Sequence, residues 1–338
     1  MTLQEALAGH QSGSRKPIYP RRRAVFAMVP VLCALSAVAA SANVFDTDDR
    51  RPLEHADGFS AVGQIACENS TRLPVGTIVD HPSLTRDRDF ELVVTVAHTF
   101  RGRRNEMQTR CHFLPGGDKE AATPVLHVAL GTLSPDKAWH HDWAIALVAG
   151  RLSDTYGALQ LATIDADDLA PLVKAGARYA LVGKNGERPQ MLISEHCGPV
   201  PKKHWHHGYF LSGEFNHDCD MIAGWSGGPL VLIHNGERRI IGINATELNG
   251  IVHKIGDPWH PRMFANTAIR FDGEFKTTLE RLAATPTSAR DLAPVADEAV
   301  VFSVLPESCA GTADTTSTIL DLTVEIALVP EAQATSVC

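Results

Sequence analysis

The amino-acid sequence predicts an all-β fold, and two observations lead to this prediction. Short apolar runs rich in valine and isoleucine recur along the chain, separated by glycine, proline, asparagine and aspartate, which favour turns. These runs do not alternate with helical patterns, as they would in a parallel α/β sheet. The pattern is typical of antiparallel barrels or sandwiches, and a hydrophobic content of 44% is sufficient for a large core.

The first segment has the features of a secretory signal. Arginines at positions 21–23 precede an apolar run over residues 24–40, and the small residues Ala40, Ser41 and Ala42 follow. We predict a signal peptide over residues 1–42, cleaved after Ala42. An uncleaved anchor is the alternative, but the run is shorter than the roughly 20 residues that span a bilayer. The expected location is periplasmic or secreted, in a bacterium, with no stable membrane span after signal removal.

Beyond this segment, the turn-bounded apolar runs predict seven strands. They cover residues 61–65, 92–97, 125–130, 144–148, 179–182, 229–233 and 240–243. Two helices are expected, over residues 166–174 and 274–282, and the second would close the domain. After about Ala284 the composition shifts to alanine, threonine, serine, proline and aspartate. We expect residues 285–338 to form a tail or small appended element, with strand potential at 300–305 and 319–329.

Charge and cysteine content narrow the class of protein further. The net charge of −8 is modest and both signs are interspersed, so no basic surface for nucleic acid is expected. Of seven cysteines, Cys33 would leave with the signal, and the remaining even number suits disulfides in an exported protein. No two cysteines have the Cys-x-x-Cys spacing that is typical of structural zinc sites. We therefore predict neither metal nor cofactor, and the sequence leaves the oligomeric state open.

A glycine-rich segment supplies a candidate nucleophile. Serine-dependent peptide hydrolysis needs a hydroxyl, an imidazole base, a carboxylate that orients the imidazole, and backbone donors for the oxyanion. The sequence Gly224-Trp225-Ser226-Gly227-Gly228-Pro229 places a serine among glycines, which allow a sharp turn whose N–H groups face a bound carbonyl. Ser226 is the predicted nucleophile. The N–H groups of Gly224 and Ser226 are the predicted oxyanion donors.

Candidates for the base and the carboxylate lie at strand ends. His98 follows the apolar run that ends at Ala97, where a side chain can project into a cleft. Asp142 precedes the run at 144–148. The order His98, Asp142, Ser226 and the words Ala-His, Asp-x-Ala and Gly-x-Ser-Gly-Gly-Pro resemble the trypsin-like serine peptidases. The resemblance implies that the three residues form a catalytic triad.

Other segments resemble the bacterial branch of these peptidases that includes the glutamyl endopeptidases. They are residues 44–50, 218–220 and 264–269, so the resemblance covers about residues 44–282. It implies a chymotrypsin-like domain over residues 43–284, made of two six-stranded antiparallel β-barrels and a C-terminal helix. The boundary between the barrels is expected near residues 150–165. His98 and Asp142 would come from the first barrel, Ser226 from the second, and protein or peptide substrates would bind between them.

The resemblance also suggests how the cysteines pair. It places Cys197 and Cys219 around the specificity pocket, which implies a disulfide between them. The usual cysteine after the catalytic histidine is replaced by Thr99, and we propose a bond between Cys67 and Cys111 in place of the missing one. Cys309 and Cys338 then remain as the last pair.

Several positions depart from trypsin or bear on specificity. Trp225 replaces the aspartate that binds a newly freed N-terminus, so that ion-pair switch should be absent, and an apolar N-terminal segment packed near Trp225 is an alternative. Asp220 lies six residues before Ser226 (226 − 220), as does the acidic pocket residue of trypsin, which implies a preference for arginine or lysine unless Met221 blocks the pocket. Asn244 replaces the pocket histidine of glutamyl endopeptidases.

Two alternatives to a peptidase remain. The altered segment at residues 76–79 and Trp225 leave open a catalytically degenerate trypsin-like homologue that acts as a binding protein. The histidines at 140, 141, 204, 206 and 207 leave open a metal-binding surface protein. They lack a helical i, i+4 pair with a nearby glutamate, and we interpret those at 204–207 as part of an exposed loop.

Overall fold

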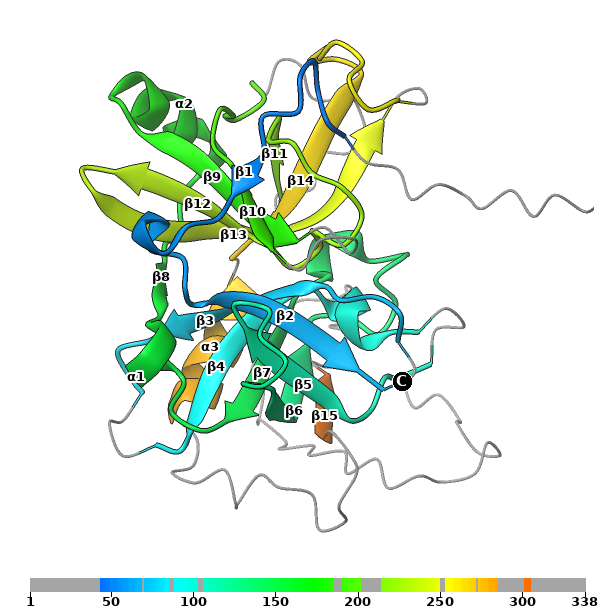
Figure 1. Ribbon diagram of the computed structural model, residues 1–338, viewed down its shortest axis with the longest axis vertical. Coiled ribbons are helices and arrows are strands. Elements are labelled where there is room, and N and C mark those ends of the chain that lie inside the picture. The colour runs from blue at the N-terminus through cyan, green and yellow to red at the C-terminus, as the bar shows by residue number, and fades with distance from the viewer. Residues whose placement is uncertain are drawn as a thin grey trace, which may run out of the picture. The chain divides into compact units, whose positions relative to one another are not determined.

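Strands dominate the computed structural model (Figure 1), which describes residues 43–68, 70–84, 88–102, 106–184, 190–201, 214–249, 253–271, 273–284 and 301–304. These residues all belong to one compact unit that begins at residue 40. The predicted all-β class is confirmed. No helix among the residues described is long and apolar enough to cross a membrane.

Six antiparallel strands form a closed first barrel. They are β2 (Val62–Cys67), β3 (Val75–Asp80), β4 (Phe90–Thr95), β5 (Cys111–Pro115), β6 (Thr123–Leu130) and β7 (Ala144–Ala149). The hydrogen-bonded order is β3-β2-β5-β6-β7-β4, and β4 pairs back with β3. Valine, isoleucine, leucine and phenylalanine from these strands fill the interior, because alternate side chains of a twisted strand face the same side.

A second row of six antiparallel strands follows. They are β9 (Arg178–Lys184), β10 (Met191–Ser194), β11 (Glu214–His217), β12 (Pro229–His234), β13 (Glu237–Asn249) and β14 (Phe264–Arg270). Their order is β10-β9-β12-β13-β14-β11. An antiparallel bridge between His217 of β11 and Pro199, which follows β10, connects the two ends of this row. A separate apolar cluster, which includes Tyr179, Phe215 and Trp225, fills this barrel.

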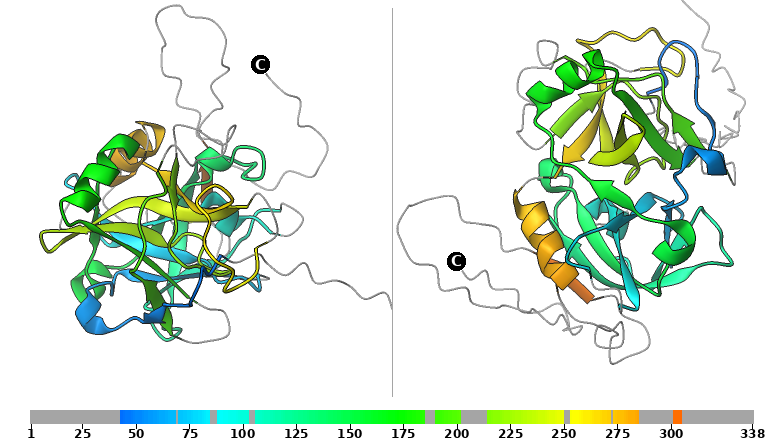
Figure 2. Two further views of the ribbon diagram at one scale, coloured as in Figure 1. Left: turned by 90° about the horizontal axis from the view of Figure 1, so that it is seen from above. Right: turned by 90° about the vertical axis from the view of Figure 1, so that its left-hand side faces the viewer.

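The remaining elements join or flank the barrels. Strand β8 (Leu159–Leu161) pairs in parallel with both β3 and β13, β1 (Arg51–Pro52) pairs with β10, and β15 (Val301–Val304) adds in parallel to β6. The helices are α1 (Ser153–Tyr156), α2 (Ala166–Lys174), α3 (Gly273–Ala284), and the 3₁₀ turns η1 (His55–Asp57), η2 (Ala97–Phe100) and η3 (Trp139–His141). Helix α3 packs on the first barrel (Figure 2). Its Phe275 meets Trp143 edge to face.

The structure agrees with most elements expected from the sequence. Each of the seven predicted runs overlaps a strand, helix α2 has the predicted bounds, and α3 begins one residue earlier and ends two later than predicted. Part of the run at 300–305 forms β15, whereas residues 319–329 lie outside the described residues. The strands that the sequence did not reveal include β5, β10 and β11, of which β11 is mostly polar.

Candidate active site

His98 and Asp142 form a pair at one end of the first barrel. Strand β4 ends at Thr95, and His98 lies in the short turn η2 that follows. Its Nδ1 lies 2.5 Å from Asp142 Oδ2, and its backbone N–H donates to Asp142 Oδ1 at 2.8 Å. Asp142 thus holds both the ring and the main chain of His98. The carboxylate is buried, but the side chain of His98 is 27% exposed, so its other ring nitrogen can be reached.

The electrostatics of this pair favour a charged imidazole. Burial lowers the pKa of His98, but the negative charge of Asp142 and its hydrogen bond outweigh burial, so the pKa is raised above the ordinary value of 6.5. A base with a pKa in this range can take a proton and return it near neutral pH.

Local packing fixes the position of Asp142. The backbone N–H of Asp142 donates to the carbonyl of Trp139, and Trp143 is fully buried against Phe275 of α3. Gly131 lies so close to the Trp143 ring that a Cβ there would come within 2.5 Å of it. A glycine is therefore needed where the chain passes the ring that anchors the carboxylate-bearing turn.

Glycines also shape the loop around Ser226. Gly224 and Gly227 have φ values of +96° and +83°, which residues with a Cβ rarely adopt. A Cβ on Gly227 would lie 2.0 Å from the carbonyl oxygen of Val75 and 2.4 Å from Thr95 Oγ1. The Gly-x-Ser-Gly-Gly word therefore allows a sharp turn that presses against the first barrel.

This loop lies beside the strand that leads to His98. The N–H of Val75 donates to the carbonyl of Ser226 at 2.8 Å, and Thr95 Oγ1 donates to the carbonyl of Val75 at 2.7 Å. Thr95 lies three residues before His98. The structure thus brings the Ser226 loop of the second barrel to the end of the first barrel that bears His98 and Asp142.

The Ser226 hydroxyl and the neighbouring amides have distinct partners. Ser226 Oγ donates to the carbonyl of Ala245 at 3.3 Å, and the described residues include no hydrogen bond between it and His98. Catalytic hydrogen bonds of this kind often form only when substrate binds. The N–H groups of Gly224 and Ser226 donate to no acceptor in the described part of the chain.

The architecture matches solved structures. A Glu endopeptidase solved in complex with MPD aligns with a TM-score of 0.52 and 12% identity, over 72% of this chain and 100% of that chain. The fold is chymotrypsin-like. Protease Anisep from Arthrobacter nicotinovorans aligns with a TM-score of 0.47 and 15% identity, over 67% of this chain and 96% of its own. The thermostable serine protease AL20 from an extremophilic microorganism aligns with a TM-score of 0.46 and 14% identity, over 68% and 99%.

These identities are low, so the likeness concerns the fold alone. No protein-family model and no curated protein sequence matches the chain.

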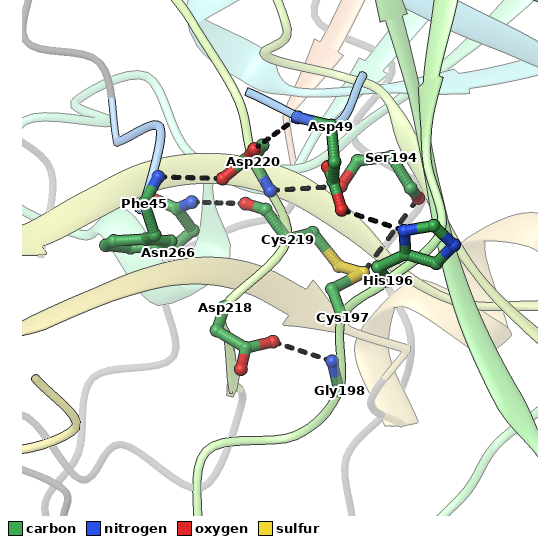
Figure 3. The surroundings of a disulfide bond; sticks show 10 residues. All are labelled: Phe45, Asp49, Ser194, His196, Cys197, Gly198, Asp218, Cys219, Asp220 and Asn266. Atoms are coloured by element: carbon green, nitrogen blue, oxygen red, sulfur yellow. Dashed lines mark hydrogen bonds and ion pairs between the residues drawn. A yellow bond between two sulfur atoms is a disulfide. The ribbon is translucent and has the colours of Figure 1, made fainter. Parts of the chain in front are cut away.

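The structure contains two disulfides of this chymotrypsin-like domain. Cys67 and Cys111 join β2 to β5, where the two residues are also register partners. Cys197 and Cys219 join the segment after β10 to the segment after β11 (Figure 3). Both pairings are those expected above. Cys309 and Cys338 lie outside the described residues.

The three predicted substrate-binding residues are buried next to the Ser226 loop. Asn244 donates from Nδ2 to the carbonyl of Trp225 at 3.0 Å, and its backbone N–H donates to Gly228. Met221 belongs to the core of the second barrel. Asp220 accepts hydrogen bonds from the N–H groups of Phe45 and Asp49. Burial raises the pKa of Asp220 to about 7, although these two hydrogen bonds act in the opposite direction.

Strand β11 carries polar groups that sequence patterning did not single out. Glu214 is buried, and neither carboxylate oxygen has a partner among the described residues. Burial raises the pKa of Glu214 to about 8. Burial also lowers the pKa of His217 to about 3. A polar, fully buried strand gives no alternating pattern, so only the resemblance around residues 218–220 pointed to this region.

The histidines considered as metal ligands are only partly described. The rings of His140 and His141 lie with their centroids 4.2 Å apart and their planes tilted by 48°, and His141 Nδ1 lies 3.5 Å from Glu274 Oε2. The described residues include no group of three or more side chains placed to hold a metal ion. Residues 204–207 lie outside the described residues.

Proposed function

We propose that the protein is an exported serine endopeptidase that hydrolyses peptide bonds through Ser226, His98 and Asp142. One observation carries the proposal. The hydrogen-bonded pair of His98 and Asp142 lies at the same end of the first barrel as the glycine-rich Ser226 loop, which a hydrogen bond from Val75 holds there. The chymotrypsin-like fold and its serine protease neighbours support it. The predicted signal and the two disulfides support export.

The geometry suggests a role for each group. Asp142 bonds Nδ1 of His98, which leaves Nε2 to take the Ser226 proton as Oγ bonds to the substrate carbonyl carbon. The negative charge passes to the carbonyl oxygen, which the N–H groups of Gly224 and Ser226 would receive. His98 then gives its proton to the leaving amine as the C–N bond breaks. Water attacks the resulting ester as His98 takes its proton, and His98 returns that proton to Ser226 Oγ as the ester C–O bond breaks and the acid product leaves.

One observation favours a second candidate function. Ser226 Oγ donates its hydrogen bond to the carbonyl of Ala245 rather than to His98, as expected of a degenerate homologue that binds peptides without cutting them. The roles of Asp220, Met221 and Asn244 in substrate binding stay predictions under either function.

Hydrolysis of unlabelled protein and of peptides tests the proposal. The wild-type protein should cleave internal peptide bonds, and Ser226→Ala should lower kcat by roughly 10⁶ while the circular dichroism spectrum stays the same. Peptide binding without cleavage by the wild-type protein would favour the degenerate homologue. Equal hydrolysis by the wild type and by Ser226→Ala would show that the nucleophile has been assigned incorrectly.

A further inference from the structure

The first described residues, 43–45, are buried against the second barrel, whereas residues 46–48 are exposed and residues 49 and 50 are half-buried. Asn43 and Val44 are fully buried and Phe45 is nearly so. Val44 accepts a hydrogen bond from the N–H of Gly256, and Asp46 donates one to Asp257. We call residues 43–50 the N-terminal segment. The burial of its first residues implies a role in the structure of the domain.

Asp220 is the main polar anchor of this segment. Its Oδ1 accepts the N–H of Phe45 at 2.8 Å and its Oδ2 accepts the N–H of Asp49 at 3.3 Å, so each carboxylate oxygen holds one main-chain group of the N-terminal segment (Figure 3). Hydrogen bonds from backbone amides to a carboxylate are stronger than those between neutral groups. The N–H of Asp220 itself donates to Ser194 Oγ, which fixes the residue from the opposite side.

A second set of contacts lies beside Asp220. The N–H of Met221 donates to the carbonyl of Asn43 at 2.9 Å. Asn43 Nδ2 donates to Asn266 Oδ1 at 2.9 Å, and Asn266 Nδ2 in turn donates to the carbonyl of Cys219 at 2.6 Å. The N-terminal segment therefore closes a buried chain of hydrogen bonds around residues 219–221.

The far end of the segment reaches the residue before the nucleophile. The guanidinium of Arg50 lies 5.6 Å from the centroid of the Trp225 ring, and Asp48 holds that guanidinium at 2.7 Å. A cation over an indole face is attractive, the more so when both are shielded from water. The N-terminal segment thus contacts the loop that carries Ser226 at both ends, at residues 220–221 and at Trp225.

The surroundings of Asp220 do not favour a substrate side chain as its partner. Asp220 is buried, with 5% of the residue exposed, and each carboxylate oxygen accepts one hydrogen bond from the N-terminal segment. It borders a cavity of about 320 Å³ whose lining includes Phe45, Asp49 and Trp259 but none of His98, Gly224 and Ser226. The open space beside Asp220 is thus lined by the N-terminal segment and not by the residues around the predicted nucleophile.

We propose that Asp220 is a positioning residue: it anchors the N-terminal segment, and the anchored segment holds the Ser226 loop in shape, so Asp220 does not select basic substrates. The effect on catalysis rests on the proposed function. The docking of the segment does not, because it follows from contacts that exist without substrate.

Two measurements on Asp220→Asn test the proposal, with Asp154→Asn as the control that removes an exposed carboxylate from α1. At pH 8, where Asp220 with its pKa of about 7 is ionised, hydrogen exchange should quicken roughly tenfold or more in peptides covering residues 43–50 and stay unchanged in β4 and β7, because asparagine lacks the charge and one acceptor oxygen. For peptides that differ only at the residue before the cut, kcat/KM should fall by a similar factor for every member of the series. The control should change neither quantity.

Two results would overturn the proposal. One is unchanged exchange over residues 43–50 in Asp220→Asn; the other is a loss of kcat/KM confined to substrates with arginine or lysine before the cut. If Asp220→Asn does not fold, the same two measurements are made on Arg50→Met. This variant removes the contact between the other end of the N-terminal segment and Trp225. If the wild-type protein cleaves nothing, the proposed function fails, and the exchange experiment alone still decides whether Asp220 is the anchor.

Discussion

Each barrel buries one glutamate, and the two residues have opposite surroundings. Glu91 of β4 is 1% exposed and accepts hydrogen bonds from Arg88 at 2.9 Å and from the hydroxyl of Ser153 at 2.5 Å. Glu214 of β11 is 3% exposed and has no partner for either oxygen in the described part of the chain. The buried carboxylate of the first barrel thus has hydrogen-bond partners. The second barrel instead buries a carboxyl group that stays neutral up to about pH 8.

This contrast extends to the candidate site. The first barrel contributes a bonded pair, His98 and Asp142, at the end of well-paired strands. The second barrel contributes the Ser226 loop, which rests on buried polar residues such as Asn244 and Asp220. The two halves of the site therefore differ in how their buried polar groups are satisfied by neighbouring residues.

The largest expected effect comes from breaking the pair in the first barrel. Asp142→Asn should lower kcat by roughly 10⁴, because an asparagine no longer stabilises the charged ring or holds the tautomer in which Nε2 accepts a proton. The measurement is kcat for a peptide substrate, with Asp154→Asn as control. A loss of less than tenfold would mean that His98 does not depend on Asp142.

The seam between the barrels should be the next most sensitive place. Gly227→Ala would set a Cβ against the Val75 carbonyl in a left-handed conformation, and we expect unfolding to become easier by about 2–5 kcal/mol, with loss of activity. Gly150→Ala is the matched control, because Gly150 has a φ of +87° and nothing within 4 Å of the added Cβ. It should cost only about 1 kcal/mol. Denaturant titration compares the two, and equal costs would show that the loop is not pressed against β3.

The two glutamates themselves provide a smaller but direct test. In the unfolded chain Glu214 ionises near pH 4.5, whereas in the folded protein it stays protonated to about pH 8, so stability should fall as pH rises between these values. Glu214→Gln should therefore be close to the wild type at pH 5 and more stable at pH 8 by roughly 3–4 kcal/mol, since each pH unit between the two pKa values costs the wild type about 1.4 kcal/mol. Glu91→Gln should be less stable at both pH values, by roughly 3 kcal/mol, because it breaks a buried ion pair. Thermal unfolding at the two pH values would contradict the comparison if both substitutions had the same sign.

The pH dependence of activity should show the smallest shift. His98 must be neutral to accept a proton, and its pKa is raised above 6.5 because Asp142 outweighs the effect of burial. The acid limb of kcat/KM against pH, measured with a substrate that does not titrate, should therefore have its midpoint above 6.5. In Asp142→Asn the midpoint should move down, since burial is then unopposed. A wild-type midpoint below 6.5 would contradict the geometry of the pair.

The sequence alone predicted those elements whose local residue pattern reflects their place in the structure. Apolar β-branched runs predicted strands such as β4 and β7, and the words around Ser226 predicted a loop that only glycine can form. It missed β11, because Glu214 and His217 are polar yet buried, and burial there depends on pairing with β14 far along the chain. The offset of Asp220 from Ser226 suggested a role in substrate binding, which stays a prediction, and no local pattern indicated that the N–H of Phe45, 175 residues away, would donate to its carboxylate.

The most direct test of the central claim is labelling with a fluorophosphonate, which bonds only to a serine that a neighbouring base has activated. We expect one phosphonate per chain, mapped to Ser226 by peptide mass spectrometry, and no labelling in His98→Ala or in Ser226→Ala. A folded wild-type protein that takes up no label, or takes it up at another serine, would contradict the assignment of His98, Asp142 and Ser226 as a working triad.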